Sequence, residues 1–251
     1  MKIGITGVSG FIGYHTYHNL KHTTDWDIVK LDKNFYDDRR IKTCDWVIHL
    51  AGINRGKPIE VHNTNMNLTQ KLLNSVKHNC NIIFSSSTQA EILSDNVYGN
   101  SKLVCEKMIE LWCKQRKNKF FNLRIPNVFG PFCKPNYNSF VATFCDKICN
   151  GDNPVIIEDS DVNLIYVKDV VEQFKNCINK GYDRITLNNG RLYNKEIVTE
   201  IKVSQVAEKL CYYKDVYFNE SKIPDLNNDF DRNLFNTFIT YLNDGDRLLS
   251  T

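Results

Sequence analysis

The sequence lacks the features that mark membrane, secreted and nucleic-acid-binding proteins. No run of 18 uninterrupted apolar residues occurs, so no membrane span is expected. The N-terminus lacks the basic segment and apolar run of a signal peptide. Net charge is only +3, without a long Lys/Arg cluster, which favours no nucleic-acid partner. These absences predict a cytoplasmic protein, in the host cytoplasm if the source is viral or parasitic.

Paired metal-ligand motifs are also missing. The nine cysteines form no CxxC pair, and no His or Cys pair complements Cys145 and Cys149. His15, His18 and His22 share one side of a predicted helix, but no carboxylate or cysteine is evident there to complete a metal site. The expectation is therefore free thiols in a reducing compartment, with no metal site.

Apolar stretches alternate with helical patterns in the first half of the chain. Strands are predicted at 2–7, 27–32, 45–51, 81–86 and 120–125, and helices at 10–21, 58–78 and 97–117. This alternation predicts an α/β fold, a Rossmann-type doubly wound parallel sheet with a small C-terminal substrate-binding lobe. We expect residues 1–126 to form mainly the dinucleotide-binding core and 127–251 mainly the lobe, with about 160–190 returning to the core.

A glycine-rich loop joins the first predicted strand to the first predicted helix. Gly7, Gly10 and Gly13 follow a GxxGxxG spacing, with Phe11 and Ile12 between the last two. Glycines at such a junction let the backbone approach a pyrophosphate, which the N-terminus of the helix then stabilises. The loop therefore predicts a nucleotide-binding site.

The end of the second predicted strand bears on the choice between NAD and NADP. Asp32 stands where a carboxylate can bind both ribose hydroxyls of NAD. Lys33 follows it, and Arg39 and Arg40 are near, so a cation could instead meet a 2′-phosphate. The residues themselves leave both cofactors open.

A tyrosine and a lysine form the candidate catalytic pair. Tyr98 and Lys102 are four residues apart and so share one face of a helix. An ammonium, together with oxidised nicotinamide, is expected to lower the pKa of the phenol. A hydroxyl from the preceding serine run, 85–87, could hold the substrate oxygen beside the phenol.

Together these motifs resemble extended short-chain dehydrogenases/reductases. The resemblance is carried by TGxxGFIG (6–13), HLAG (49–52), SSS (85–87), YGxSK (98–102) and NVFGP (127–131). The longer segments HLAGINR, SSSTQA and PNVFGPFCKPNYNS are similar to the reductase domain of bifunctional enzymes of capsule and O-antigen sugar synthesis. That resemblance implies reduction of the 4-ketone of a UDP-2-acetamido-2,6-dideoxy-L-hexulose, with NADP(H) favoured and NAD(H) possible. The product would be UDP-L-RhaNAc- or UDP-L-TalNAc-like.

The resemblance also implies a role for individual residues. It makes Tyr98 the proton donor, Lys102 the cation that tunes it and binds the nicotinamide ribose, and Ser87 the group that positions the ketone. The implied cofactor-binding residues, besides those of the glycine loop, are Asp32, Lys33, Leu50, Ala51, Gly52, Asn65 and Lys102. The implied substrate-binding residues are Asn54, Arg55, Ser87, Thr88, Asn127, Lys134, Asn136, Asn138 and Ser139.

The chain departs from the family pattern in two places. The bifunctional enzymes carry a C-terminal cupin domain, for which a chain ending at Thr251 leaves no room, so a stand-alone reductase is expected. Val162-Asn163 stands where many sugar epimerases carry Arg-Asp.

The same residues also bear on alternative activities. Thr88-Gln89 replaces the Asp-Glu of 4,6-dehydratases, which argues against dehydration. A C4-epimerase with tightly bound NAD and a non-catalytic NAD(P)-sensing scaffold remain alternatives. By resemblance, helices 58–78 and 97–117 are expected to form a homodimer contact.

Overall fold

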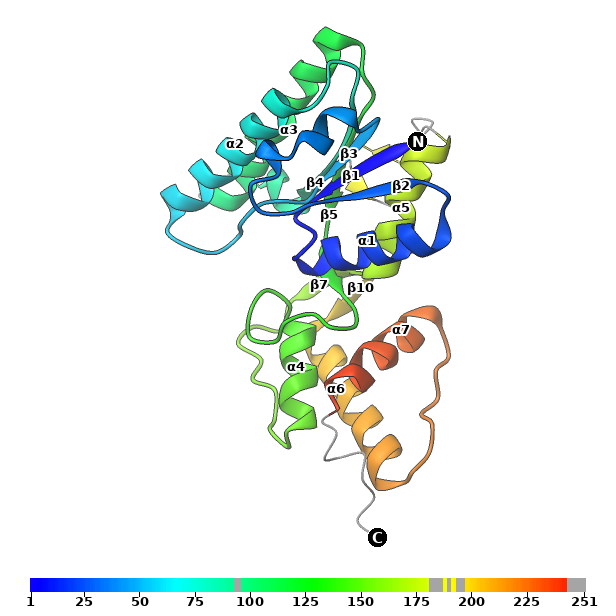
Figure 1. Ribbon diagram of the computed structural model, residues 1–251. Helices are drawn as coiled ribbons and strands as arrows, with labels where there is room; N and C mark the ends of the chain where they lie inside the picture. Colours follow the sequence, from blue (N-terminus) through cyan, green and yellow to red (C-terminus); the bar gives the residue numbers. More distant parts are fainter. Residues whose placement is uncertain (93–95, 181–186, 189–190, 193–196, 243–251) are drawn as a thin grey trace. The chain divides into compact units, whose positions relative to one another are not determined.

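The computed structural model describes residues 1–92, 96–180, 187–188, 191–192 and 197–242. Two compact units divide the chain (Figure 1). Unit 1 comprises residues 1–126 and 168–194, and unit 2 comprises residues 127–167 and 195–251. Among the described residues, no helix has both the length and the apolar character needed to cross a membrane.

Unit 1 follows the predicted alternation closely. Its strands are β1 (Lys2–Thr6), β2 (Asp27–Leu31), β3 (Trp46–His49), β4 (Asn81–Ser87), β5 (Phe120–Ile125), β8 (Leu187–Asn188) and β9 (Arg191–Leu192). Its helices are α1 (Phe11–Thr23), α2 (Pro58–Ser75), α3 (Val97–Arg116) and α5 (Val167–Lys180), with short turns η1 (Phe35–Asp37), η2 (Arg39–Thr43) and η3 (Thr88–Glu91).

The central sheet of unit 1 has the strand order β2-β1-β3-β4-β5-β9-β8. Strands β1 to β5 pair in parallel, and β8 pairs antiparallel to β9. The predicted Rossmann-type fold is confirmed. Because the chain moves from β1 to β2 on one side and then to β3 on the other, the order reverses between β1 and β3. Ligands of doubly wound sheets bind outside the carboxyl ends of the strands at such a reversal.

Helices cover both faces of this sheet. Figure 1 shows α2 and α3 on one side and α1 with α5 on the other. Between the sheet and α2/α3 lies a core of fully buried side chains, among them Leu31, Ile41, Leu72, Ile82 and Ile109. Helix α2 ends at Ser75, three residues before the predicted end, because Val76 adopts an extended conformation (φ −72°, ψ 153°) and is itself buried.

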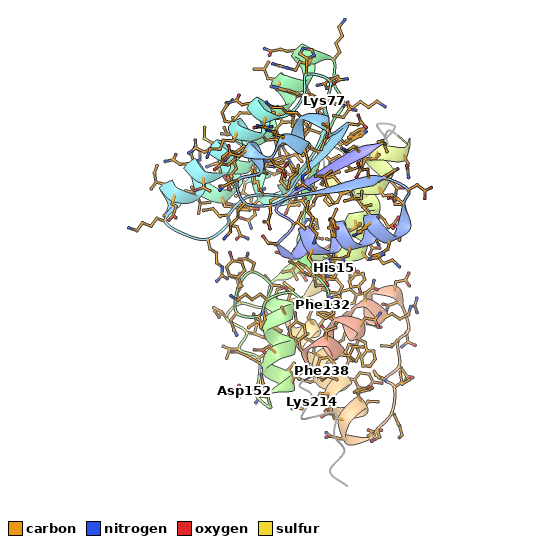
Figure 2. The ribbon with its side chains drawn as sticks, viewed as in Figure 1. His15, Lys77, Phe132, Asp152, Lys214 and Phe238 are labelled. Atoms are coloured by element: carbon orange, nitrogen blue, oxygen red, sulfur yellow. The ribbon has the colours of Figure 1, made fainter. Side chains whose placement is uncertain are left out.

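Unit 2 contains a second sheet and its own core. Strands β6 (Asn127–Phe129), β7 (Asp161–Tyr166) and β10 (Val198–Lys202) form it in the order β10-β7-β6. Its helices are α4 (Phe140–Cys149), α6 (Val203–Lys214) and α7 (Asp229–Phe238), with short turns η4 (Asp215–Asn219) and η5 (Ile239–Tyr241). Phe129, Phe144, Leu210 and Phe238 are among its buried core residues. Figure 2 labels Phe238.

Candidate active site

The glycine loop lies where the strand order of the sheet reverses. Gly7 has φ +69°, a left-handed conformation that favours glycine. A Cβ there would stand 2.8 Å from the backbone nitrogen of Ala51, so only glycine allows the loops after β1 and β3 to touch. The N–H of Gly10 donates to the Gly7 carbonyl at 3.0 Å and closes the turn before α1.

The N-terminus of α1 fits an anionic group such as a dinucleotide pyrophosphate. Gly10 is the N-cap residue and brings no side-chain hydrogen bond, and the first turn of α1 contains no acidic residue. The first N–H groups of this helix therefore lack a side-chain acceptor at the cap, and no carboxylate in that turn offsets the helix dipole. Phe11 and Ile12 lie half-buried in this turn, and Gly13 is buried.

A hydrogen-bond network missed by the sequence analysis ties the two loops together. The Thr6 hydroxyl oxygen accepts hydrogen bonds from the N–H groups of Leu50 and Ala51, both at 3.1 Å. With both lone pairs occupied, the hydroxyl donates its hydrogen to Nδ1 of His49, 2.8 Å away. The network fixes the backbone at Leu50–Ala51 against the end of β1.

His49 is fully buried and neutral. Burial and, to a smaller extent, the positive charge of Lys102 lower its pKa to about 3. Because Nδ1 accepts from Thr6, the ring hydrogen is on Nε2, which faces the Thr69 hydroxyl at 3.5 Å. The sequence contained a signal for this network, because a histidine inside a buried apolar strand needs hydrogen-bond partners.

Asn65 joins the loop after β3 to α3. Its Oδ1 accepts from the N–H of Ile53 at 2.8 Å, and its Nδ2 donates to the Ile53 carbonyl at 2.9 Å and the Ser101 hydroxyl at 3.0 Å. A Cβ on Gly52 would lie 3.0 Å from Asn65 Oδ1 and 3.7 Å from Lys102 Nζ. Two predicted cofactor-binding residues, Gly52 and Asn65, thus lie beside Lys102.

The other predicted cofactor-binding residues follow β2 and are exposed. Asp32 accepts a hydrogen bond from the Ser9 hydroxyl of the glycine loop at 3.3 Å, and Lys33 is exposed next to it. Arg40 binds Asp38 through two of its nitrogens, at 3.0 and 2.7 Å, so its charge is already paired. The glycine loop thus reaches Asp32 directly.

Helix α3 begins at Val97, so Tyr98 and Lys102 lie in its first two turns. The Asn96 side chain caps the helix by accepting from the Gly99 N–H at 3.0 Å. A Cβ on Gly99 would lie 2.1 Å from the Gln89 carbonyl oxygen, so glycine lets the first turn of α3 press against η3. Gly99, to which the motifs assigned no role, thus brings Tyr98 close to the segment that follows Ser87.

Lys102 is buried and held by the backbone. Its Nζ donates to the Ser85 carbonyl at 2.8 Å and lies 4.7 Å from the Phe84 ring centre and 5.8 Å from that of Tyr98. Burial lowers the pKa of Lys102 to about 8, so the side chain is still mostly charged at pH 7.

Tyr98 behaves differently from the expectation. Burial raises its pKa to about 12 in the chain alone, opposite to the lowering expected from Lys102 and oxidised nicotinamide. Desolvation of the phenolate is the main cause, and Cys105 adds to it. The neutral phenol that results is the form able to donate a proton.

Ser87 is oriented by the turn that follows it. It caps η3 and accepts from the N–H of Gln89 at 3.2 Å, which leaves its hydroxyl hydrogen to donate. Thr88 follows, half-buried, as the first residue of η3. Asn54 and Arg55 are exposed in the loop between β3 and α2.

The remaining predicted substrate-binding residues belong to unit 2. Asn127 starts β6 and is exposed, and Lys134, Asn136 and Asn138 are exposed in the loop before α4. The Ser139 hydroxyl accepts from the Ala142 N–H at 3.3 Å and caps α4, so its oxygen already has a structural function. In β7, Val162 and Asn163 pair with Ile201 and Glu200.

Metal ligands do not gather in the described part of the chain, where no group of three His, Cys, Asp or Glu residues is placed to hold an ion. His18 and His22 stack with ring centres 6.4 Å apart on α1. All nine cysteines are free thiols, and seven of them are buried.

Comparison with known proteins places this geometry in a family. Residues 3–188 match the NAD dependent epimerase/dehydratase family. The chain is 31% identical, over 96% of its length, to UDP-2-acetamido-2,6-beta-L-arabino-hexul-4-ose reductase of Pseudomonas aeruginosa, and it spans 65% of the length of that relative.

Two solved structures share the fold. The capsular polysaccharide assembling protein CapF of Staphylococcus aureus is 31% identical, with a TM-score of 0.82 covering 98% of this chain and 67% of CapF. RMD of Pseudomonas aeruginosa, solved with NADPH, is 18% identical, with a TM-score of 0.74 covering 97% and 100% of the two chains. The resemblance to extended short-chain dehydrogenases/reductases is thereby confirmed, and this chain belongs to the NAD dependent epimerase/dehydratase family.

Proposed function

We propose that this chain is a reductase of the 4-keto group of a UDP-linked 2-acetamido-2,6-dideoxy-L-hexulose. The observation that supports the proposal is the placement of Ser87 at the carboxyl end of β4 and of Tyr98 and Lys102 in the first turns of α3, with Lys102 Nζ 5.8 Å from the Tyr98 ring centre. The substrate class comes from the relative that is 31% identical, which is a reductase of such a UDP-hexulose.

The three side chains fit the reduction of a ketone. The Ser87 hydroxyl would donate a hydrogen bond to the ketone oxygen, and neutral Tyr98 would donate the proton as that oxygen becomes an alkoxide. The Lys102 ammonium would stabilise the tyrosinate that remains and hold the nicotinamide ribose. A bound nicotinamide would supply the hydride.

The cofactor is proposed to be NADP(H), with NAD(H) as the alternative. Arg40 is paired with Asp38, so the cation most directly placed for a 2′-phosphate is Lys33, which is exposed beside Asp32. A repulsive contact between Asp32 and that phosphate would instead favour NAD(H). The proposed compartment is the cytoplasm, which the nine free thiols support.

The function is tested by adding the 4-keto product of a UDP-GlcNAc 4,6-dehydratase/5-epimerase to the chain and cofactor. We expect loss of absorbance at 340 nm with NADPH, slower loss with NADH, and one new UDP-sugar of the L-rhamno or L-talo type by NMR. Without absorbance loss beside an active control reductase, the proposal is wrong. Stoichiometric NAD retained through purification, with interconversion of C4 epimers, would indicate the epimerase alternative. Failure of the chain to convert any UDP-sugar while it still binds cofactor would favour the non-catalytic sensor.

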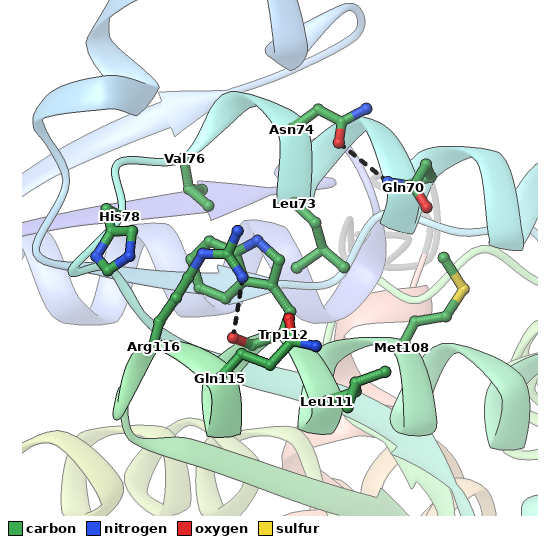
Figure 3. A pocket seen from close by; sticks show the side chains of 10 residues that line it. All are labelled: Gln70, Leu73, Asn74, Val76, His78, Met108, Leu111, Trp112, Gln115 and Arg116. Carbon is green, nitrogen blue, oxygen red and sulfur yellow. Dashed lines mark hydrogen bonds between the residues drawn. The ribbon is translucent and has the colours of Figure 1, made fainter.

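We also propose a homodimer formed through α2 and α3. A pocket of about 610 Å³ lies between these helices, lined in part by Leu73, Val76, Met108 and Trp112. Figure 3 shows the side chains that line it. Leu111 lies at its edge with 58% of its surface exposed. A large exposed apolar side chain beside a pocket lined by both apolar and polar residues favours a protein contact.

Leu111→Glu is expected to convert the dimer to monomer, because the carboxylate would be buried unpaired in the contact. Sedimentation velocity of the wild type and variant measures this. Ile223→Glu in unit 2, where Ile223 is 75% exposed, is the matched control and should stay dimeric. A monomeric wild type, or a Leu111→Glu dimer as strong as the wild type, would contradict the proposed contact.

A further inference from the structure

A buried carboxylate that the proposed chemistry does not use lies one helical turn beyond Lys102. Glu106 is on α3, and only 5% of its side chain is exposed. Its Oε1 accepts from the Ser86 hydroxyl at 2.5 Å and from Arg124 Nε at 2.9 Å, and its Oε2 accepts from Arg124 Nη2 at 2.6 Å. The carboxylate thus joins α3, β4 and β5.

Ser86 connects this cluster to the candidate site through the backbone. It stands between Ser85, whose carbonyl holds the Lys102 ammonium, and Ser87, whose hydroxyl is proposed to bind the ketone oxygen. Ser86 and Arg124 are paired residues in the β4–β5 register, so both present their side chains to the same face of the sheet. Glu106 binds both of them from α3.

We propose that Glu106 is a positioning residue: together with Arg124 it anchors Ser86 and thereby fixes the Ser85 carbonyl and the Ser87 hydroxyl on either side. This inference rests on the proposed function, because it assigns Lys102 and Ser87 the roles given there. Arg124 is held on its other side by Glu91, at 3.3 Å, so the anchor also reaches η3, the turn after Ser87.

The charges around Lys102 support this role. Tyr98, Cys105 and Glu106 face it from α3, His49 faces it from β3, and the Phe84 ring contacts it from β4. Of these groups only Glu106 is anionic near neutral pH: burial raises the pKa of the Cys105 thiol and of Tyr98, and His49 is neutral. Burial raises the pKa of Glu106, but hydrogen bonds from Arg124, Ser86 and Asn122 and the charge of Arg124 together outweigh it, so the pKa is lowered. Its carboxylate therefore favours the protonated form of Lys102.

The first test is the titration of Lys102 in the ligand-free chain, followed by NMR with ¹³C-labelled lysine. Its signal is identified by its disappearance in Lys102→Met. In Glu106→Gln we expect the proton affinity of Lys102 to fall about tenfold, because the Ser85 carbonyl is less firmly held against the ammonium and the Glu106 charge one turn away is lost. Glu110→Gln, on the same helix but in an exposed pair with Lys107, is the matched control and should titrate as the wild type. A Lys102 titration unchanged by Glu106→Gln overturns the inference.

The second variant, Ser86→Ala, removes one hydrogen bond and no charge, so it tests the anchor even where Glu106→Gln does not fold. We expect kcat to fall about tenfold, since the Ser87 hydroxyl loses its fixed position, with NADPH affinity nearly unchanged. Normal kcat in a folded Ser86→Ala chain overturns the inference. Because the titration needs neither cofactor nor sugar, an inactive wild type would refute the proposed function and leave the role of Glu106 to be decided by the titration.

Discussion

Tyr98→Phe is expected to lower kcat by about a thousandfold, the largest effect predicted for any single substitution here. The change removes one oxygen and leaves the ring, so the packing at the start of α3 is retained. Without the phenol, the developing alkoxide has no proton donor in place, and the Ser87 hydroxyl can only hydrogen-bond to it. NADPH affinity should stay within about twofold of the wild type, since the proposed cofactor contacts lie on Lys102 and the glycine loop.

Two measurements check this prediction. Steady-state kinetics with the 4-keto UDP-sugar gives kcat, and quenching of protein fluorescence gives the Kd for NADPH. Tyr217→Phe, at a tyrosine of unit 2 that is 39% exposed, is the control and should behave as the wild type. A Tyr98→Phe chain with near-normal kcat would show that another group donates the proton.

Lys102→Met is expected to inactivate the chain and yet make it more stable. Turnover should fall by at least about a hundredfold, because the ammonium that stabilises the tyrosinate is lost, and NADPH should bind more weakly. Burial lowers the pKa of this lysine from 10.5 to about 8, so keeping it charged in the folded state costs about 3 kcal/mol at pH 7. Methionine has a similar shape and no charge. After the loss of the hydrogen bond to the Ser85 carbonyl, a net gain of about 1–2 kcal/mol remains.

The stability gained by Lys102→Met is expected to depend on pH. Between pH 8 and 10.5 the folded chain has released the Lys102 proton while the unfolded chain still holds it, so wild-type stability rises with pH in that window. The advantage of Lys102→Met should therefore be full below pH 8 and vanish toward pH 10.5. Urea unfolding at pH 7 and at pH 10 measures it.

Lys107→Met supplies the matched control, because Lys107 lies on the same helix with 70% of its side chain exposed. It should change neither activity nor the pH dependence of stability. Destabilisation of Lys102→Met at pH 7, or retention of turnover, would contradict the assignment of Lys102 as a buried catalytic cation.

The sequence predicted the fold well because hydrophobic periodicity specifies it locally. The strand at 120–125 has the predicted ends, and the helix that carries Tyr98 and Lys102 starts at the predicted residue 97. The periodicity could not predict contacts between distant segments. The bond from Thr6 to His49 joins residues 43 apart, and that from Ser86 to Glu106 joins residues 20 apart. Both bonds depend on which strands and helices become neighbours in the fold.

The candidate site shows the same division. Spacing alone places Tyr98 and Lys102 on one helix face, but the direction of the Tyr98 pKa depends on how deeply the phenol is buried. Gly99 is a further example, since its need for glycine appears only when η3 packs within 2.1 Å of a Cβ at that position. The motifs identify the residues that are proposed to react, whereas the packing around each side chain determines whether it is charged.

The most direct test of the proposed function is to follow the hydride. The chain would be incubated with the 4-keto UDP-sugar and NADPH carrying two deuterium atoms at C4 of the nicotinamide, and the product analysed by NMR. A reductase transfers one deuterium to C4 of the sugar for each NADPH oxidised, and Tyr98→Phe abolishes the transfer. A product without deuterium at C4, or one formed without NADPH oxidation, would contradict the account.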